Sequence, residues 1–153
     1  FLSNFKGIAL HSEIKKIDIV EENSESVYIE VGAGVVWDNF VALAVTKGWG
    51  GIENLSLIPG EIGASAIQNI GAYGVEVKDV IERINAVSLE NGTIKTFSNT
   101  EAKYGYRQSI FKNELKNKYI ITSVVFRLAK NTTYTLTEKG KLLADKIASE
   151  LFV

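Results

Sequence analysis

The feature that most constrains this chain is a glycine-rich segment that is also strongly apolar. Residues 48–74 contain seven of the thirteen glycines and the single proline, Pro59. A flexible linker would be polar, because a chain that buries little apolar surface stays disordered. Here large apolar side chains recur throughout, namely Ile52, Leu55, Leu57, Ile58, Ile62, Ile67 and Ile70. The segment is therefore predicted to be ordered and packed but irregular, and long ordered segments of this kind usually carry function.

A strand pattern and then a helix pattern precede this segment. Residues 26–31 alternate with period two, which predicts a half-buried strand whose inner face carries Val27, Ile29 and Val31. The next stretch has helical spacing, with one face made of Trp37, Phe40, Val41, Ala44 and Val45. The ends of this helix are marked by Asp38 near its start, Lys47 in its last turn and Gly48 at the left-handed cap position.

After the segment, strand patterns return at residues 80–89, 93–97 and 119–128. Asn91-Gly92 predicts a two-residue hairpin turn between the first two of these strands. Residues 98–101 match a capping box and predict a short helix. Residues 137–151 have a helical pattern with Leu142, Leu143, Ile147 and Leu151 on one side. Strands joined by hairpins and short helices favour an α+β fold with a mainly antiparallel sheet.

Composition excludes several classes of site and partner. The net charge of −1 gives no electrostatic footprint for nucleic acid, and no apolar run approaches the roughly 20 residues of a membrane span. The chain has no cysteine and one histidine, His11, so neither disulfides nor a multi-histidine metal site is expected. It has no methionine and begins at Phe1, from which we expect a fragment or a processed product.

Two stretches are candidate functional sites. In residues 58–74, small side chains would let a ligand approach the backbone, and Ser65 could cap a short helix over residues 66–69 with free amides for an anion. The side chains of Gln68 and Asn69 suit the edge of a heteroaromatic ring. The alternative is a tight glycine-rich turn between packed elements. In residues 104–111, Arg107 lies among aromatic residues, either as an anion clamp or as a surface arginine stacked on tyrosines.

Taken together, the motifs resemble a known family. Gly51-Ile52-Glu53-Asn54-Leu55, Ile58-Pro59-Gly60, the run from Gln68 to Glu76 and Tyr106-Arg107-Gln108-Ser109-Ile110-Phe111-Lys112 occur in this order. The series is similar to that of the UDP-N-acetylenolpyruvoylglucosamine reductases, flavoenzymes that make UDP-N-acetylmuramate for bacterial peptidoglycan. The resemblance runs from Phe1 to about Lys130, including Val31-Gly32-Ala33-Gly34 and Trp37.

The resemblance implies a partial FAD-binding domain over residues 1–130, of the two-part type found in vanillyl-alcohol oxidase. It implies FAD as cofactor, NADPH as hydride donor and UDP-N-acetylglucosamine enolpyruvate as substrate, in a cytoplasmic enzyme. Carried over by motif, the substrate site would include Tyr73, Tyr106 and the catalytic Arg107. The flavin would be lined by Ile58, Pro59, Gly60, Ser65, Ile67, Ile70 and Gly71.

The chain also departs from the family pattern. The family's Gly-Ser-Asn loop for the FAD pyrophosphate would precede Phe1, and its proton-donating serine and assisting glutamate would follow Val153, so we expect the chain alone to be inactive. Ala66 stands where proline is usual, and Glu138 stands at the position of a substrate-binding tyrosine. Residues 131–153 are left as a helical segment of uncertain assignment. The alternative is a flavin or nucleotide binding module without catalysis, or a structural or regulatory domain with the same fold.

Overall fold

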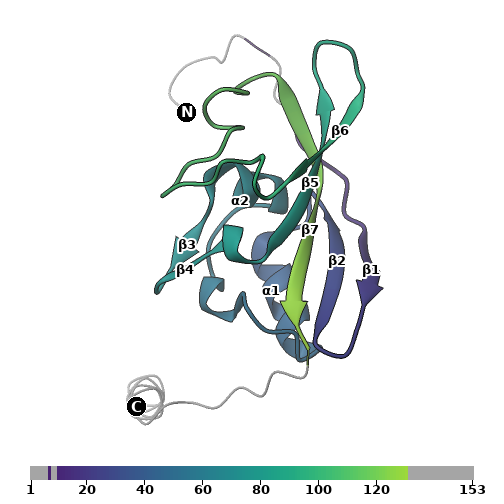
Figure 1. The fold of residues 1–153 in the computed structure, drawn as a ribbon, viewed down its shortest axis with the longest axis vertical. Helices are drawn as coiled ribbons and strands as arrows, with labels where there is room; N and C mark the ends of the chain where they lie inside the picture. The colour runs from purple at the N-terminus through teal and green to yellow at the C-terminus, as the bar shows by residue number, and fades with distance from the viewer. Residues whose placement is uncertain (1–6, 8–9, 131–153) are drawn as a thin grey trace.

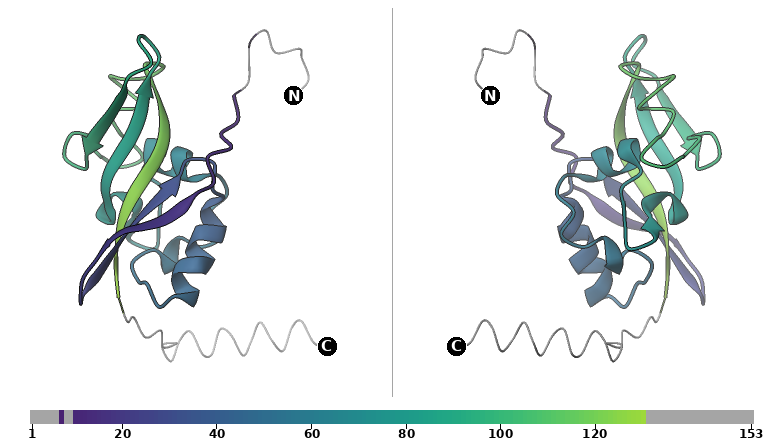
Figure 2. Two further views of the ribbon diagram at one scale, coloured as in Figure 1. Left: turned by 90° about the vertical axis from the view of Figure 1, so that its right-hand side faces the viewer. Right: turned by 90° about the vertical axis from the view of Figure 1, so that its left-hand side faces the viewer.

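The computed structural model describes residue 7 and residues 10–130, and these residues form one antiparallel sheet with two α-helices on one of its faces (Figures 1 and 2). The strand order is β1-β2-β7-β5-β6. The strands are β1 (Ile17–Glu22), β2 (Ser26–Gly32), β5 (Ile81–Ser88), β6 (Ile94–Ser98) and β7 (Tyr119–Ala129). Every neighbouring pair is antiparallel. The predicted α+β class with a mainly antiparallel sheet is therefore confirmed.

The core lies between the sheet and the helices. As predicted, Val27, Ile29 and Val31 of β2 are fully buried, since alternate side chains of a strand point to the same face. The first helix, α1 (Trp37–Thr46), buries Trp37 and Phe40 against Phe126 of β7. The three rings pack with centroids 5.0–6.1 Å apart. Tilted and edge-on aromatic contacts of this kind add to the area that the rings bury.

The functional segments lie in one long excursion between β2 and β5. This excursion contains α1, the short helix η1 (Glu53–Leu55), α2 (Ile62–Gln68), the two-stranded β3 (Gly71–Ala72) and β4 (Val75–Glu76), and the short helix η2 (Val77–Asp79). The prediction that it is packed is confirmed, because the buried residues include Ile52, Leu55, Ile62 and Ile70. Gly48 has a positive φ of 69°, as the predicted cap requires.

Three details of the predicted packing are wrong. Leu57 is 83% exposed, because its backbone has a φ of 61° and its amide donates to Asp38 Oδ1 at 2.7 Å. Val45 lies at the edge of the helix face and is also exposed. Lys47 follows the last turn of α1 as its C-cap residue instead of lying within that turn.

The turn between β5 and β6 is longer than predicted. The backbone amide of Gly92 donates to the Ser88 carbonyl at 2.9 Å, and the amide of Ser88 donates to the Thr93 carbonyl at 2.9 Å. The loop thus has four residues, 89–92. The side chain of Asn91 accepts from the Thr93 amide at 3.0 Å, which gives the asparagine a local role different from that in a two-residue turn.

The predicted capping box at residues 98–101 forms, but no helix follows it. Glu101 Oε2 accepts from the Ser98 amide at 2.8 Å, and Ser98 Oγ accepts from the Glu101 amide at 3.3 Å. The chain makes one turn and then leaves the helical region, since Lys103 has a φ of 46°. The predicted helix at 137–151 and the segment 131–153 lie outside the described residues.

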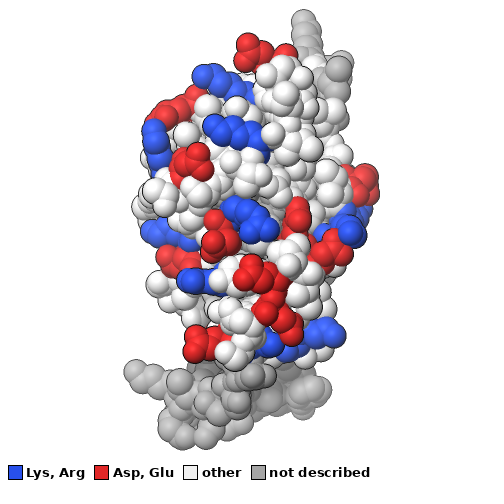
Figure 3. All heavy atoms as spheres, turned by 45° about the vertical axis from the view of Figure 1, so that its right-hand side comes forward, with Lys and Arg blue, Asp and Glu red and all other residues white. Residues whose placement is uncertain are grey.

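The described residues contain no helix that is long and apolar enough to cross a membrane, and no group of three potential metal ligands among histidine, aspartate and glutamate. On the face of the molecule in Figure 3, lysines and arginines are interspersed with aspartates and glutamates. On that face no single sign of charge prevails.

Candidate functional site

The start of α2 is fixed by the loop that follows β2. The amides of Ile62 and Gly63 donate to the carbonyls of Val35 and Ala33, each at 3.0 Å, so these two amides are not free for an anion. The helix begins at Ile62 rather than at Ala66, and Ser65 lies inside it, with its hydroxyl donating to the Ile62 carbonyl at 2.7 Å. The predicted Ser65 cap is therefore wrong. The reason is that the carbonyls of Val35 and Ala33, far away in the sequence, satisfy the helix start.

A first cavity of about 310 Å³ opens beside α2. Its lining combines an aromatic ring with small and apolar side chains and a few polar groups. The lining residues are Trp37, Ile58, Pro59, Glu61, Ala64, Ser65, Gln68, Ile70 and Arg107. Next to it, Gly60 has a φ of 120°, and the position of a Cβ there would have no atom within 4 Å. Backbone approach by a ligand is unobstructed at this glycine.

The hairpin of β3 and β4 carries Tyr73 at its tip. Tyr73 and Gly74 have φ values of 51° and 80°, and consecutive positive values characterise the tight hairpin turns that match the twist of the strands. The Tyr73 side chain is 90% exposed. At the base of the hairpin, a Cβ on Gly71 would lie 2.8 Å from the carbonyl oxygen of Val75, so this position requires glycine.

Arg107 belongs to a second tight turn. Gly105 and Gln108 exchange two backbone hydrogen bonds, 3.1 and 3.0 Å long, and Arg107 between them has a φ of 55°. Its guanidinium donates to the carbonyl of Gly71 at 2.6 Å and lies 6.0 Å from the ring centroid of Tyr106. Lys112 Nζ donates to the Arg107 carbonyl at 2.9 Å. Backbone and side chain of this arginine are thus both held, although the residue is exposed.

A second cavity of about 560 Å³ lies between the two turns. It is lined by Gly71, Ala72, Tyr73, Gly74, Val75, Glu76, Lys78, Asp79, Tyr106 and Arg107. Opposite charges are paired along its wall, because Lys78 Nζ contacts Glu76 Oε2. The hydrogen bond from Lys78 is the main reason that the pKa of Glu76 lies below its usual value, and the charge of Arg107 contributes less. Arg107 lines both cavities and marks where they meet.

Three hydrogen bonds join the turn of Arg107 to the end of α2. Ser109 Oγ donates to the Ile67 carbonyl at 2.6 Å, Asn69 Nδ2 donates to the Gly105 carbonyl at 2.9 Å, and Arg107 donates to Gly71. Residues 67, 69 and 71 therefore alternate along one segment and hold residues 109, 105 and 107 of the other. We call these three bonds the 67–71 ties.

The structure separates the predicted site residues into groups. Four of the predicted flavin-lining residues line the first cavity, namely Ile58, Pro59, Ser65 and Ile70. The predicted substrate residues Tyr73, Tyr106 and Arg107 line the second cavity together with Gly71. Ile67 is not brought to either cavity but lines a different one, with Leu10 and Phe111. Asn69, expected to face a ring edge, is fully buried and bonds to the chain itself.

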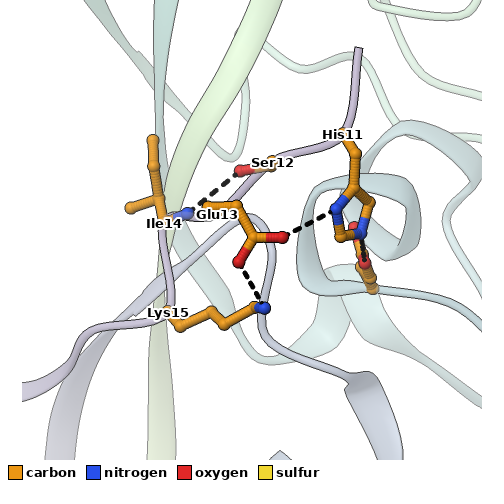
Figure 4. Close-up of polar contacts among 6 residues, drawn as sticks. His11, Ser12, Glu13, Ile14 and Lys15 are labelled. Carbon is orange, nitrogen blue, oxygen red and sulfur yellow. Dashed lines mark hydrogen bonds and ion pairs between the residues drawn. The ribbon is translucent and has the colours of Figure 1, made fainter. Parts of the chain in front are cut away.

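The sequence analysis did not find a role for His11. Its ring contacts Glu61 at 2.7 Å and Glu13 at 2.9 Å, and Glu13 also reaches Lys15 (Figure 4). The hydrogen bond that the His11 ring donates to Glu61 is the largest of the causes that raise the pKa of His11 above 6.5. Since Glu61 lines the first cavity, this group joins the segment before β1 to the cavity wall. Its signal in the sequence is only a lone histidine.

Comparison with known proteins identifies the fold. The sequence profile of the FAD binding domain family matches residues 2–98. The chain belongs to this family. Among curated relatives of this FAD binding domain, the UDP-N-acetylenolpyruvoylglucosamine reductase of Bacteroides fragilis is 50% identical over 136 residues, which is 89% of this chain and 41% of the relative. The reductase of Flavobacterium johnsoniae is 44% identical over 139 residues, which is 91% of this chain and 41% of the relative.

A solved structure agrees with these relatives. The crystal structure of the UDP-N-acetylenolpyruvylglucosamine reductase of Thermus caldophilus superimposes with a TM-score of 0.59 at 28% identity, covering 66% of this chain and 36% of that one. The resemblance stated from the motifs is thereby confirmed. This FAD binding domain chain spans about two fifths of the length of the curated relatives it matches.

Proposed function

We propose that this chain forms the flavin-ring and substrate-facing part of a reductase for UDP-N-acetylglucosamine enolpyruvate, with FAD as cofactor and NADPH as hydride donor. The product would be UDP-N-acetylmuramate for peptidoglycan, made in the cytoplasm. The observation that supports this best is the position of Arg107. Its guanidinium is fixed by the Gly71 carbonyl and lines both the first cavity, which combines Trp37 and apolar side chains with a few polar groups, and the second cavity.

The residues present fit a flavin ring. The first cavity is lined by Trp37 and by the apolar side chains of Ile58 and Ile70, and the open backbone at Gly60 permits close approach. Gln68 lines the same cavity and carries both hydrogen-bond donors and an acceptor, which suits the polar edge of the ring. The residues proposed to surround the flavin are Ile58, Pro59, Gly60, Ser65, Ile70 and Gly71. Ile67 lines a different cavity, and its carbonyl accepts from Ser109.

Arg107 is suited to the charge that develops on the substrate. A flavin held in the first cavity would supply a hydride for the enolpyruvyl double bond, and negative charge would then develop toward the substrate carboxylate. A guanidinium has five N–H donors. One nitrogen of Arg107 is occupied by Gly71, so the remaining donors are available for two oxygens. Because the guanidinium is held before the substrate arrives, little reorganisation is needed when the charge appears.

The substrate is proposed to lie in the second cavity. Tyr73 and Tyr106 are both strongly exposed at its rim, where their rings can cover a sugar or the uracil base. Lys78 belongs to the same lining and would add positive charge toward a diphosphate, in competition with its ion pair to Glu76. This arrangement favours an anionic substrate next to Arg107.

The test uses a chimera of the Bacteroides fragilis reductase in which its matched segment is replaced by that of this chain. Arg107→Lys keeps the positive charge but loses the fork of donors. We expect the rate of flavin reoxidation by substrate to fall about 10²–10³-fold, with flavin reduction by NADPH nearly unchanged, because loss of one preorganised donor has this size of effect. Arg127→Lys, at an exposed position of β7, is the matched control.

Two results would contradict the proposal. Equal losses in both half-reactions would show that Arg107 acts only through folding. A chimera that binds flavin but never transfers a hydride to the substrate would favour the alternative, a binding module without catalysis. The 153-residue chain alone is expected to show no turnover of UDP-N-acetylglucosamine enolpyruvate with NADPH, which a coupled absorbance assay measures directly.

A further inference from the structure

Asn69 is a buried polar residue in a backbone conformation that few residues adopt. It caps the C-terminus of α2 with φ of 47° and ψ of 63°, and none of its surface is exposed. Asparagine is one of the few non-glycine residues that visit the left-handed region without a large penalty. A buried amide side chain must also find hydrogen-bond partners, since an unpaired one carries a desolvation cost.

Both ends of the Asn69 amide bond to backbone groups, one in the turn of Arg107 and the other at Lys78. Nδ2 donates to the Gly105 carbonyl at 2.9 Å, and Oδ1 accepts from the Lys78 amide at 3.1 Å. Lys78 lines that cavity, and the Gly105 carbonyl also accepts from the Gln108 amide, the bond that closes the turn of Arg107. Asn69 therefore holds one end of the turn on which Arg107 is carried.

The other end of Arg107 depends on the same segment. Its guanidinium donates to the carbonyl of Gly71, two residues after Asn69. Asn69 holds the backbone of the turn and Gly71 holds the guanidinium. A shift of Asn69 relative to Gly71 would therefore change the direction of the guanidinium.

We propose that Asn69 is the positioning residue that sets the orientation of Arg107 toward the substrate. This inference rests on the proposed function. Asn69 does not touch the substrate itself, because it is fully buried. Its effect passes through the Gly105 carbonyl to the turn of residues 105–108. A misplacement of about 1 Å in a reacting constellation can lower a rate roughly 100-fold.

The chain offers a matched control in Asn99. This residue also carries a partly buried amide that ties distant backbone, with Nδ2 donating at 2.7 Å to the carbonyls of Lys78 and Ile81. Among the described residues, Asn99 makes no hydrogen bond to the turn of residues 105–108. Loss of its side chain removes a comparable number of hydrogen bonds without releasing that turn.

Asn69→Gly removes the side chain and keeps the left-handed backbone free of strain. In the chimeric reductase we expect it to lower flavin reoxidation by substrate roughly 10–100-fold while flavin reduction by NADPH changes less than about threefold. Asn99→Ala should leave both half-reactions nearly unchanged. In an Arg107→Ala background, Asn69→Gly should have almost no further effect on reoxidation, because the group it positions is gone.

Equal losses in both half-reactions, or an Asn69→Gly loss that persists in the Arg107→Ala background, would overturn the proposal. If Asn69→Gly does not fold, Asn69→Asp is used instead. Aspartate keeps the acceptor for the Lys78 amide and tolerates the left-handed backbone, but it replaces the donor to Gly105 by an acceptor and adds a negative charge near Glu76.

A second readout does not depend on catalysis. In the 153-residue chain, Asn69→Gly should speed amide hydrogen exchange of Gln108 at least about tenfold, since local opening releases the bond that closes the turn. Asn99→Ala should not. Unchanged exchange at Gln108 would refute the positioning role. If the parent chimera has no reductase activity but Gln108 exchange responds as expected, the proposed function fails and the structural link between Asn69 and the turn stands.

Discussion

The Ser109→Ala variant gives the sharpest test of how residues 105–109 are attached to α2. The Ser109 side chain is fully buried and donates to the Ile67 carbonyl at 2.6 Å. Ile67 lies in the last turn of α2, where carbonyls lack partners within the helix. Removal of the hydroxyl leaves this carbonyl without the donor. An orphaned buried polar group costs about 1–3 kcal/mol, and the missing oxygen leaves only a small void.

Ser88→Ala is the matched control for this prediction. Ser88 is also buried, but its hydroxyl accepts a single bond of 3.3 Å from the amide of Glu90, an exposed residue in the loop after β5. Water can accept from the exposed Glu90 amide in place of the lost hydroxyl, so we expect the free energy of unfolding to fall by less than about 1 kcal/mol. The two variants remove the same atom from two buried serines and differ in what the hydroxyl holds.

Urea unfolding followed by tryptophan fluorescence measures both variants, because Trp37 is buried in the core. With a slope of about 1–3 kcal/mol per molar urea, Ser109→Ala should lower the midpoint by about 1 M. The slope itself should not change. Equal stability losses in Ser109→Ala and Ser88→Ala would show that the tie between Ser109 and Ile67 contributes nothing specific, and the reasoning about the 67–71 ties would be wrong.

Three further predictions concern charge and packing. His11, the only histidine, should titrate by proton NMR with a pKa above 6.5, and Glu61→Gln should lower it; its contribution to stability is full below pH 6.5 and is lost as the pH rises through the folded pKa. An unchanged His11 pKa in Glu61→Gln would contradict the contact between His11 and Glu61. The hydrogen bond from the Leu57 amide is the main cause that lowers the pKa of Asp38 below 3.8. The ionised Asp38 carboxylate therefore stabilises the fold above that pH, and this stabilisation is lost as the pH falls through the folded pKa. Urea unfolding across this range should show a smaller acid-dependent loss in Asp38→Asn than in the parent. Gly71→Ala should destabilise by about 1–3 kcal/mol, since its Cβ would lie 2.8 Å from the carbonyl across the hairpin, and a neutral urea midpoint would show that the hairpin can yield.

The sequence predicted best the features that depend on neighbours along the chain. Alternation placed Val27, Ile29 and Val31 on the buried face of β2, and helical spacing placed Trp37 and Phe40 in the core, because burial follows the period of each element. The motifs identified the family for the same reason, since they are local strings. The packing of residues 48–74 followed from their apolar content.

The details that failed depend on partners far away in the sequence. The start of α2 at Ile62 is decided by carbonyls of residues 33 and 35, so Ser65 could not be recognised as an interior residue. Asn69 bonds to Gly105, 36 positions later. The position of an asparagine just after a helix does suggest a left-handed cap, and that local signal would have indicated a structural role for Asn69 before any role at a ring edge.

The central strand of the sheet is also the last described element, and this affects how the chain can be built. β7 pairs with β2 on one side and with β5 on the other, so β1-β2 and β5-β6 have no direct contact through the sheet without it. During synthesis the β1-β2 and β5-β6 hairpins would each have an unpaired strand edge until residue 129 has left the ribosome. Contacts that span about 90 residues, such as that between Ser123 and Glu30, close late and slow folding. A polypeptide that stops before β7 should therefore be prone to aggregation through the unpaired edges of β2 and β5. A circularly permuted domain would shorten this exposure if β7 were synthesised before the two hairpins.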